Sequence, residues 1–420
     1  MNVLTLIFTI ALAISAAVRG WLTGRQIRHV QRHRDTVPEA FSASIELPVH
    51  QKAADYTVTK TYFSLAGTAL DLVLALLWTV GGGLALLDTA WRHAHINLLT
   101  TGVLVIASYA LINALIELPL SAYSTFGIET RFGFNRTSAK TWLLDRLKML
   151  LLAAVLGVPL LYAVLFLMDR SGQLWWLYVW ILWLAFSMAL TWAYPIFIAP
   201  LFNKFSPLTD TNLKQRIESL LVRCGFTSRG VFVMDGSARS AHGNAYFTGF
   251  GRHKRIVFFD TLMDKLTPGE IEAVLAHELG HFRLKHVIQR LIVTAVLSFV
   301  GLAILGWLAA NSWFYHGLGV SQPSSYMALL LFTLLAPPFL FLLEPLSSAW
   351  SRRHEFQADA YASRHAKAAT LIHALVKLYQ DNATTLTPDP LHSAFHDSHP
   401  PALARVLRLQ ELASVEHPSP

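Results

Sequence analysis

Seven apolar stretches constrain this chain more than any other feature of its sequence. Each meets or approaches the roughly 20 residues that an α-helix needs to cross the hydrocarbon of a bilayer. The sequence therefore predicts a mainly α-helical, polytopic membrane protein with about seven transmembrane helices. The stretches are residues 3–22, 63–87, 97–121, 149–168, 174–196, 287–309 and 326–347.

The composition agrees with a membrane location. Only 14% of the 420 residues are charged and 54% are hydrophobic, whereas roughly 25% of residues are charged in soluble domains. The first stretch ends in small residues, as a signal peptide does, but basic residues follow it and none precedes it, which favours a retained span. Cys224 is the only cysteine, so no internal disulfide can form, and we expect a buried structural thiol.

Lysine and arginine are distributed unevenly between the connecting segments. They cluster after the first and third stretches, whereas the loops around 88–96, 169–173 and 310–325 hold few or none. The positive-inside rule then predicts an N-terminus outside and a C-terminus in the cytoplasm. The net charge of +8 belongs mainly to loops near anionic lipid and indicates no nucleic-acid partner. The clustered residues are Arg25, Arg28, Arg32, Arg34, Arg131, Arg136, Lys140, Arg146 and Lys148.

The apolar stretches divide the chain into four parts. Residues 1–196 hold spans one to five with their basic cytoplasmic loops, and residues 287–347 hold spans six and seven. Residues 197–286 and 348–420 are polar blocks. Because both blocks are expected on the cytoplasmic side, they can meet and form one domain.

The first polar block combines strand and helix signals. Residues 230–235 and 254–260 are short, β-branched and aromatic, and glycines before the second suit a hairpin turn, so we expect a small sheet. Thr267 can cap a helix that has Pro268 at its first position and Glu270 three residues after the cap. This helix is expected to contain EIEAVLAHELGHFRLKH, whereas the last residues of the chain, VEHPSP, are expected to form a loose tail.

The motif His277-Glu278-Leu279-Gly280-His281 lies inside this predicted helix. Its two histidines are four residues apart, so both imidazoles lie on one face and can reach a single Zn²⁺ at roughly 2.0–2.1 Å. Glu278 lies beside them and can take the proton of the attacking water. A chance match occurs in roughly one chain of this length per hundred, so the motif alone is only suggestive.

A third ligand must come from elsewhere in the chain. Leu284 and Val287 stand where the extended HExxHxxGxxH motif needs glycine and histidine. His286 is turned off the ligand face of a continuous helix. Glu355 and Asp359 are four residues apart on a probable helix, so one can ligate zinc while the other accepts the outer N–H of a ligand imidazole. The alternative for this segment is a solvated Arg/Glu helix face.

Several separate strings resemble one known family over nearly the whole chain. HELGH and a later SRRHEFQAD are accompanied by SHPP near the C-terminus. The combination resembles the type I CAAX prenyl proteases, the seven-span zinc branch of that activity. The other matching strings are LPLSAYSTFGIETRFGFN (118–135), IAPLFNKFSPL (198–208) and GNAYFTGF (243–250).

The resemblance implies one zinc ion per chain, with His277, His281 and Glu355 as ligands and Glu278 as the catalytic base. It also implies a supporting role for Asp359, which family descriptions sometimes call a proton donor. We favour orientation of a ligand histidine instead, because a carboxylate that is hydrogen-bonded to that histidine should stay ionised.

Two further sites follow from the resemblance. His399 matches the family's C-terminal histidine and would stabilise the oxyanion of the tetrahedral intermediate, although a surface loop histidine is the alternative. Arg405 follows at the family's spacing and would hold His399 or a substrate carboxylate. Asn244, Ala245 and Tyr246 would form the sheet edge that pairs with an extended peptide.

Polar residues inside the apolar stretches must face protein or water, because hydrocarbon penalises a charge by at least about 2.5–3.5 kcal/mol. They are Asp71, Asn113, Glu117 and Glu344. In the resembling family the spans enclose a water-filled chamber, which would suit these residues, and contacts between helices are the alternative.

These observations favour a zinc-dependent membrane endopeptidase that cleaves prenylated CAAX-type C-terminal peptides and contacts membrane lipid. General endoproteolysis of membrane proteins is an alternative. A transporter or channel is another alternative. Transporters often have Gly/Pro-broken spans in two matching halves, but GGG at 81–83 and PP at 337–338 belong to no repeat.

A bacterial inner membrane suits this short chain, and relatives in eukaryotes reside in the endoplasmic reticulum. Nothing in the sequence indicates an oligomeric state.

Overall fold

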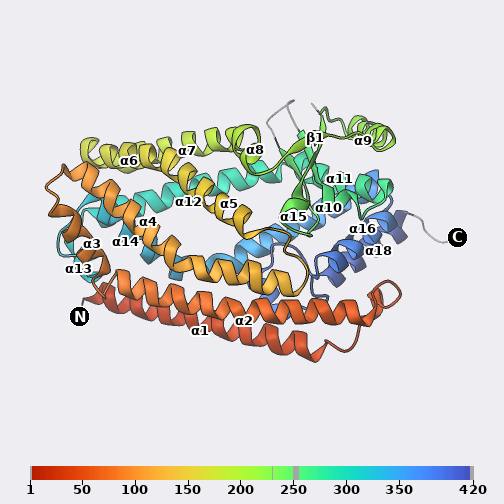
Figure 1. Cartoon of the computed structure of the whole chain (residues 1–420), viewed down its shortest axis with the longest axis horizontal. Helices are drawn as coiled ribbons and strands as arrows, with labels where there is room; N and C mark the ends of the chain where they lie inside the picture. The colour runs from red at the N-terminus through yellow and green to blue at the C-terminus, as the bar shows by residue number, and fades with distance from the viewer. Residues whose placement is uncertain (1, 229, 249–254, 417–420) are drawn as a thin grey trace.

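The computed structural model describes residues 2–228, 230–248 and 255–416. Long helices run side by side along one axis, and the polar blocks form a smaller domain of helices and strands at one end (Figure 1). We call this domain the head domain. It comprises the described residues from 205 to 283 and from 344 to 416, which are labelled β1 to α11 and α15 to α18. The two chain termini lie at opposite ends of the long axis, as an odd number of membrane crossings requires (Figure 1).

Seven helical segments are long and apolar enough to cross a membrane, which confirms the predicted number. Three are unbroken helices, and the others contain a π-helical or 3₁₀ turn. They are α1 (Val3–Arg32), α2 (Leu47–Trp78), α4 with its π turn (Leu98–Glu129), α5 and α6 (Ala139–Leu152 and Val158–Arg170), α7 and α8 (Trp175–Ala193 and Ala199–Phe202), α12 (His286–Ala309), and α14 and α15 (Ser325–Leu340 and Glu344–His365).

The second span begins and ends earlier than predicted. Residues 63–87 were expected to cross the membrane, but α2 ends at Trp78 and a new helix, α3, covers Gly83–Arg92. Gly82 adopts a left-handed conformation with φ 79°, which glycine accommodates without steric cost, and α3 begins directly after it. The apolar run therefore turns back on itself after residue 78.

The seventh span leads directly into the head domain. Helix α14 contains Pro337 and Pro338, passes through a short 3₁₀ turn and continues as α15. Helices α1 and α2 also extend beyond the bundle and lie along the head domain (Figure 1). Side chains on α15 are therefore positioned by the membrane bundle as well as by the head domain.

The head domain contains a four-stranded sheet in the order β1-β2-β4-β3. The two expected strands are present as β2 and β4, which pair in parallel, while β1 and β3 pair antiparallel to their neighbours. The expected hairpin turn at residues 249–254 and the final tail residues 417–420 lie outside the described residues. The strands are β1 (Phe205–Pro207), β2 (Val231–Met234), β3 (Ala245–Thr248) and β4 (Arg255–Phe259).

Helix α11, which the sequence predicted to begin at Pro268, packs against β3 of the sheet. The capping box is present, because the Thr267 side chain accepts from the Glu270 N–H and the Glu270 carboxylate accepts from the Thr267 N–H. Cys224 is buried in this core, as expected. The remaining helices are α9 (Thr211–Arg223), α10 (Asp260–Met263), α11 (Pro268–Arg283), α13 (Ser312–Gly317), α16 (Ala368–Asp381), α17 (Pro390–His396) and α18 (Ala402–Glu416).

The polar residues of the spans face the interior, as expected. Asp71, Asn113 and Glu117 line a cavity of about 390 Å³ between α1, α2, α4 and α14. Glu344 instead forms an ion pair with Arg19 of α1 at 3.0 Å. Asp71 and Glu117 therefore stay exposed where they line this pocket, and Glu344 finds a basic partner.

Candidate metal centre

Helix α11 presents His277 and His281 on one face, one turn apart. Their Nε2 atoms lie 3.2 Å from each other, and the His277 side chain is nearly buried, with 9% exposed. Because the capping box fixes where α11 begins, it also fixes which face of the helix carries the two rings. The predicted pairing of the two imidazoles is therefore present.

Glu355 of α15 completes a three-residue cluster. Its Oε2 lies 3.5 Å from Nε2 of His277, and its Oε1 lies 3.3 Å from Nε2 of His281. Within the described ranges, these three residues have donor atoms that all lie within 4.8 Å of one another. Two helices that are far apart in the sequence thus bring one donor set together.

The cluster fits a tetrahedral metal. Bonds of about 2.0–2.1 Å at tetrahedral angles separate the donor atoms by about 3.4 Å, and the observed separations run from 3.2 to 3.5 Å. Glu355 is 3% exposed, and its Oε2 accepts no hydrogen bond. A buried carboxylate oxygen without a partner is costly, so a bound cation explains this arrangement better than a purely structural role.

Asp359 lies behind His277 and is not among the clustered donors. Nδ1 of His277 donates to Asp359 Oδ1 at 2.8 Å, and Arg405 of α18 donates to both carboxylate oxygens at 2.6 and 2.9 Å. This geometry leaves Nε2 of His277 as the free donor atom for a metal. Burial opposes protonation of His277, but the nearby carboxylates of Asp359 and Glu355 outweigh it and raise the pKa of His277 to about 9.

Arg405 differs in its partner from the sequence prediction. We expected it to hold His399 or a substrate carboxylate. Its side chain is instead 7% exposed and donates two hydrogen bonds to the Asp359 carboxylate. A bidentate pair of this kind is strong and geometrically specific. The third nitrogen, Nη1, lies 3.9 Å from Glu355 Oε2, and Arg405 also lines the cavity beside the cluster.

Glu278 lies in the wall of the cavity that contains the cluster. This cavity has a volume of about 890 Å³ and is also lined by His277, Glu355 and His399. Burial raises the pKa of the Glu278 carboxyl above its ordinary value. The expected base therefore lies beside the two histidines and faces the space that a substrate would occupy.

His399 lies at the exposed side of the same cavity. Its side chain is 66% exposed, and Nε2 lies 3.6 Å from Glu355 Oε2. The other ring nitrogen, Nδ1, lies 3.1 Å from the Ser398 hydroxyl. The ring thus stands next to the donor cluster without joining the three-residue set.

Arg352 holds the segment that leads to His399, a role that sequence reasoning missed. Its Nη1 lies 3.1, 3.2 and 2.9 Å from the carbonyl oxygens of Ser393, Ala394 and Asp397. Carbonyls in the last turn of a helix often lack partners within it. Ser393 also accepts from the Asp397 N–H at 3.0 Å, so Arg352 joins the end of α17 to the residue that follows it. The arginine pair in SRRHE was the available signal, but its target could not be read from the sequence.

The expected substrate strand is at the sheet edge, because β3 pairs only with β4 among the described strands. Asn244 and Ala245 line the cavity, whereas the Tyr246 side chain lies on the other side, with its hydroxyl 4.0 Å from Met234 Sδ. Successive side chains of a strand point to opposite faces. Tyr246 therefore belongs to the expected edge through its backbone, while its side chain faces away from the cavity.

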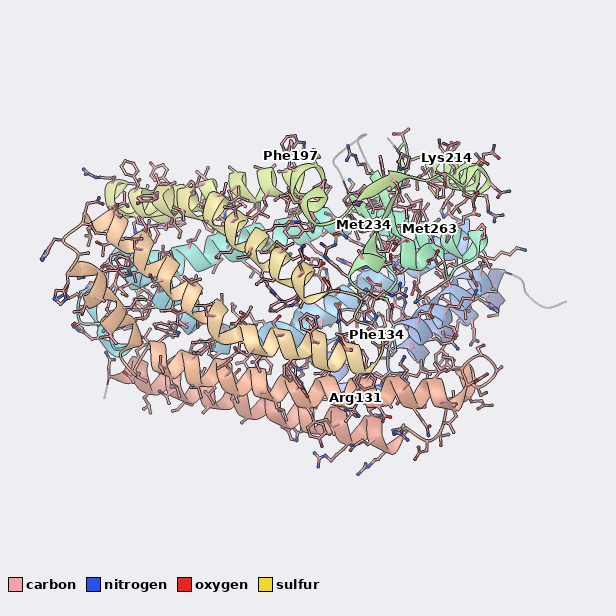
Figure 2. The ribbon with its side chains drawn as sticks, in the orientation of Figure 1. Arg131, Phe134, Phe197, Lys214, Met234 and Met263 are labelled. Carbon is pink, nitrogen blue, oxygen red and sulfur yellow. The ribbon has the colours of Figure 1, made fainter. Side chains whose placement is uncertain are left out.

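The loop before β3 is anchored to the membrane bundle. The side-chain oxygen Oδ1 of Asn382, the residue after α16, lies 3.2 Å from Nδ1 of His242 and accepts from the Gly243 N–H at 3.1 Å. The His242 ring stacks on Phe134, with centroids 4.4 Å apart. Figure 2 shows Phe134 where the chain leaves the third span, and its backbone carbonyl accepts from the Ala241 N–H of this loop at 3.0 Å.

The sequence predicted that His286 lies within α11. This prediction is wrong, because that helix ends at Arg283. Lys285 adopts a left-handed conformation with φ 60°, and His286 begins the next helix, α12. Its ring points back so that Nδ1 lies 3.0 Å from Nδ1 of His281. His286 is therefore a neighbour of a donor histidine and not itself one of the clustered donors.

Comparisons with known proteins agree with this geometry. Residues 26–204 match the family model for the CAAX prenyl protease N-terminal region with five membrane helices, and residues 207–413 match peptidase family M48. The chain is 33% identical over 417 residues to CAAX prenyl protease 1 of Saccharomyces cerevisiae, covering 93% of this chain and 91% of the relative. It is 30% identical to the human CAAX prenyl protease 1 homolog, covering 97% and 96%.

A solved structure has the same fold. The crystal structure of S. mikatae Ste24p superposes with a TM-score of 0.90 at 32% identity, covering 97% of this chain and 99% of that one. These matches favour an enzyme over the transporter or channel that the spans alone allowed. The chain belongs to the CAAX prenyl protease family of M48 metallopeptidases and is a multi-span membrane hydrolase that acts on peptide bonds.

Proposed function

We propose that this membrane metallopeptidase uses one zinc ion, held by His277, His281 and Glu355, to cleave prenylated CAAX-type C-terminal peptides. The observation that carries the proposal is the tetrahedral spacing of the three donors, with Glu278 beside them in the wall of the 890 Å³ cavity. The relatives named CAAX prenyl protease support the substrate class.

The residues of the site divide the chemistry between them. Bound zinc supplies a Lewis acid for the scissile carbonyl and for the attacking water. Glu278 takes the proton of that water and passes it to the leaving amine. His399 donates to the carbonyl oxygen as it becomes negative. Asp359 stays ionised beside Arg405 and keeps the hydrogen of His277 on Nδ1.

The peptide is proposed to bind as an added strand. The free edge of β3 offers backbone groups to an extended chain along Asn244, Ala245 and Tyr246. The walls of the cavity also include Gln26 of α1 and Tyr56 of α2. A peptide at the metal centre therefore lies against membrane-spanning helices, where the lipid of a modified cysteine would also be.

Cleavage of matched peptides tests the substrate class. The same C-terminal sequence is supplied with and without a farnesyl group to the purified protein in detergent, and a Glu278→Gln variant serves as the control for contaminating proteases. We expect cleavage directly after the farnesylated cysteine and little cleavage without the lipid. Equal cleavage of both peptides would favour general membrane endoproteolysis instead.

We also propose that residues 197–286 and 348–420 form one cytoplasmic zinc domain. The packing of α11 on α15 supports a common side for both blocks, and the basic loops support the cytoplasmic side. In a Cys224→Ser background, Ser240→Cys and Gln380→Cys should react with an impermeant thiol reagent only from the cytoplasmic face. Labelling of the two sites from opposite faces would contradict the shared domain.

A further inference from the structure

We propose that His286 and Gln357 are positioning residues for the metal ligand His281. They form a hydrogen-bonded relay that fixes which nitrogen of His281 faces the metal and how its ring is turned. The inference rests on the proposed function, since it requires a metal at Nε2 of His281. It extends that function by assigning a role to two residues outside the donor cluster.

The geometry of the relay is continuous from the cluster to the surface. Nδ1 of His281 lies 3.0 Å from Nδ1 of His286, and Nε2 of His286 lies 3.0 Å from Oε1 of Gln357. His286 is 1% exposed, whereas Gln357 is an exposed residue on α15. Three side chains from three helices, α11, α12 and α15, thus form one hydrogen-bonded line.

Metal binding fixes the direction of every hydrogen bond in this line. A neutral imidazole carries one hydrogen, so His281 can offer Nε2 to a metal only if its hydrogen is on Nδ1. That N–H then donates to Nδ1 of His286, which must be unprotonated. The hydrogen of His286 is consequently on Nε2 and donates to the Gln357 carbonyl oxygen.

The fold holds the His286 ring on its face as well as at its edges. Its ring stacks on His354 with centroids 3.9 Å apart and planes inclined by 5°. Nε2 of His354 lies 3.1 Å from Oε1 of Gln289. The left-handed Lys285 aims the first residue of α12 back at α11. A ring constrained in this way can hold its hydrogen-bond partner in one orientation.

The two ligand histidines are therefore held by different chemistry. His277 donates to the ionised pair Asp359–Arg405, whereas His281 donates to an uncharged imidazole backed by a carboxamide. Residues that orient metal ligands typically change metal affinity by about 10–100-fold when they are removed. A change at the exposed Gln357 should therefore reach the buried metal through His286.

Zinc dissociation constants of the full-length protein in detergent test the relay. They are measured by competition with a chelator of known affinity. His286→Leu removes the acceptor for His281 and should weaken zinc binding by about 10–100-fold. Gln357→Leu should weaken it by up to about 10-fold, and Gln357→Glu should restore it, because the carboxylate again accepts from Nε2 of His286.

Gln410→Leu is the matched control, since it makes the same substitution at another exposed glutamine of the head domain, on α18 and outside the relay. It should leave zinc affinity unchanged, and the visible spectrum of the cobalt-substituted protein should change in Gln357→Leu but not in Gln410→Leu. Equal losses in Gln357→Leu and Gln410→Leu, or a His286→Leu affinity within about twofold of the unmodified protein, would overturn the relay. If His286→Leu fails to fold, the exposed Gln357 pair decides. Failure of the unmodified protein itself to bind zinc would instead refute the proposed function.

Discussion

Replacement of Gly280 by alanine should separate the two helices that build the metal centre. Gly280 lies on α11 between the two histidines, where α11 packs directly on α15. A Cβ at this position would lie 3.0 Å from Cα and 3.1 Å from the carbonyl oxygen of Ala358, and 3.1 Å from Cβ of Tyr361. Two of these three atoms are backbone, so α15 itself has to move.

The size of this movement exceeds what the metal centre tolerates. Carbon atoms in contact prefer separations of about 3.5–4.0 Å, so α15 must retreat by roughly 0.5–1 Å at Ala358. Ala358 lies three residues after Glu355, whereas metal ligands must stay within about 0.2 Å of their ideal distances. Overpacking of this kind costs about 1–3 kcal/mol, which corresponds to roughly 5- to 150-fold in metal affinity.

The assay is the zinc dissociation constant of Gly280→Ala in detergent, measured by chelator competition, together with peptide cleavage. Gly269→Ala on the same helix is the matched control. Its added Cβ would meet its nearest neighbours, Arg216 Nη2 and Thr370 Cγ2, at 3.7 and 3.8 Å, which are ordinary contacts. This variant should bind zinc normally and gain about 0.4–1 kcal/mol in stability. Unchanged zinc affinity and cleavage in Gly280→Ala would refute the reasoning.

Three further predictions concern the acidic residues. Glu278→Gln should keep its zinc and lose cleavage by about 10²–10⁴-fold, because an amide cannot accept the proton, and cleavage at the normal rate would contradict that role. Asp359→Asn should lower zinc affinity by about 10–100-fold, measured by chelator competition, and unchanged affinity would remove it from the site. Burial opposes ionisation of Glu270, but Lys377 at 2.7 Å holds the pKa of Glu270 below its ordinary value. Its stabilising contribution is present above the unfolded pKa of about 4.3 and is lost as the pH falls through the folded value. Thermal unfolding between pH 6 and 3 should therefore depend less on pH in Glu270→Gln, and identical profiles would contradict this.

The sequence predicts well where structure depends on local pattern. The seven spans follow from apolar length, and the start of α11 follows from Thr267, Pro268 and Glu270. The donors on α11 follow from helical spacing alone. The spacing of Glu355 and Asp359 predicts a shared face but does not say which of them faces the metal.

The remaining features depend on tertiary contacts or on single backbone angles. Arg405 and Asp359 are 46 residues apart in the sequence, so no local sequence pattern predicts their ion pair. The left-handed Lys285 decides where His286 points, and lysine gives no signal for that conformation. The side chain of Tyr246 depends on strand register, because a shift of one residue reverses the face.

Zinc content tests the central claim most directly, because the claim is that two segments far apart in the sequence hold one metal. Elemental analysis of the purified full-length protein should give one zinc per chain, and Glu355→Ala should lower that occupancy although Glu355 lies outside the HExxH motif. A content near zero in the unmodified protein, or a content that His277→Ala leaves unchanged, would contradict the account.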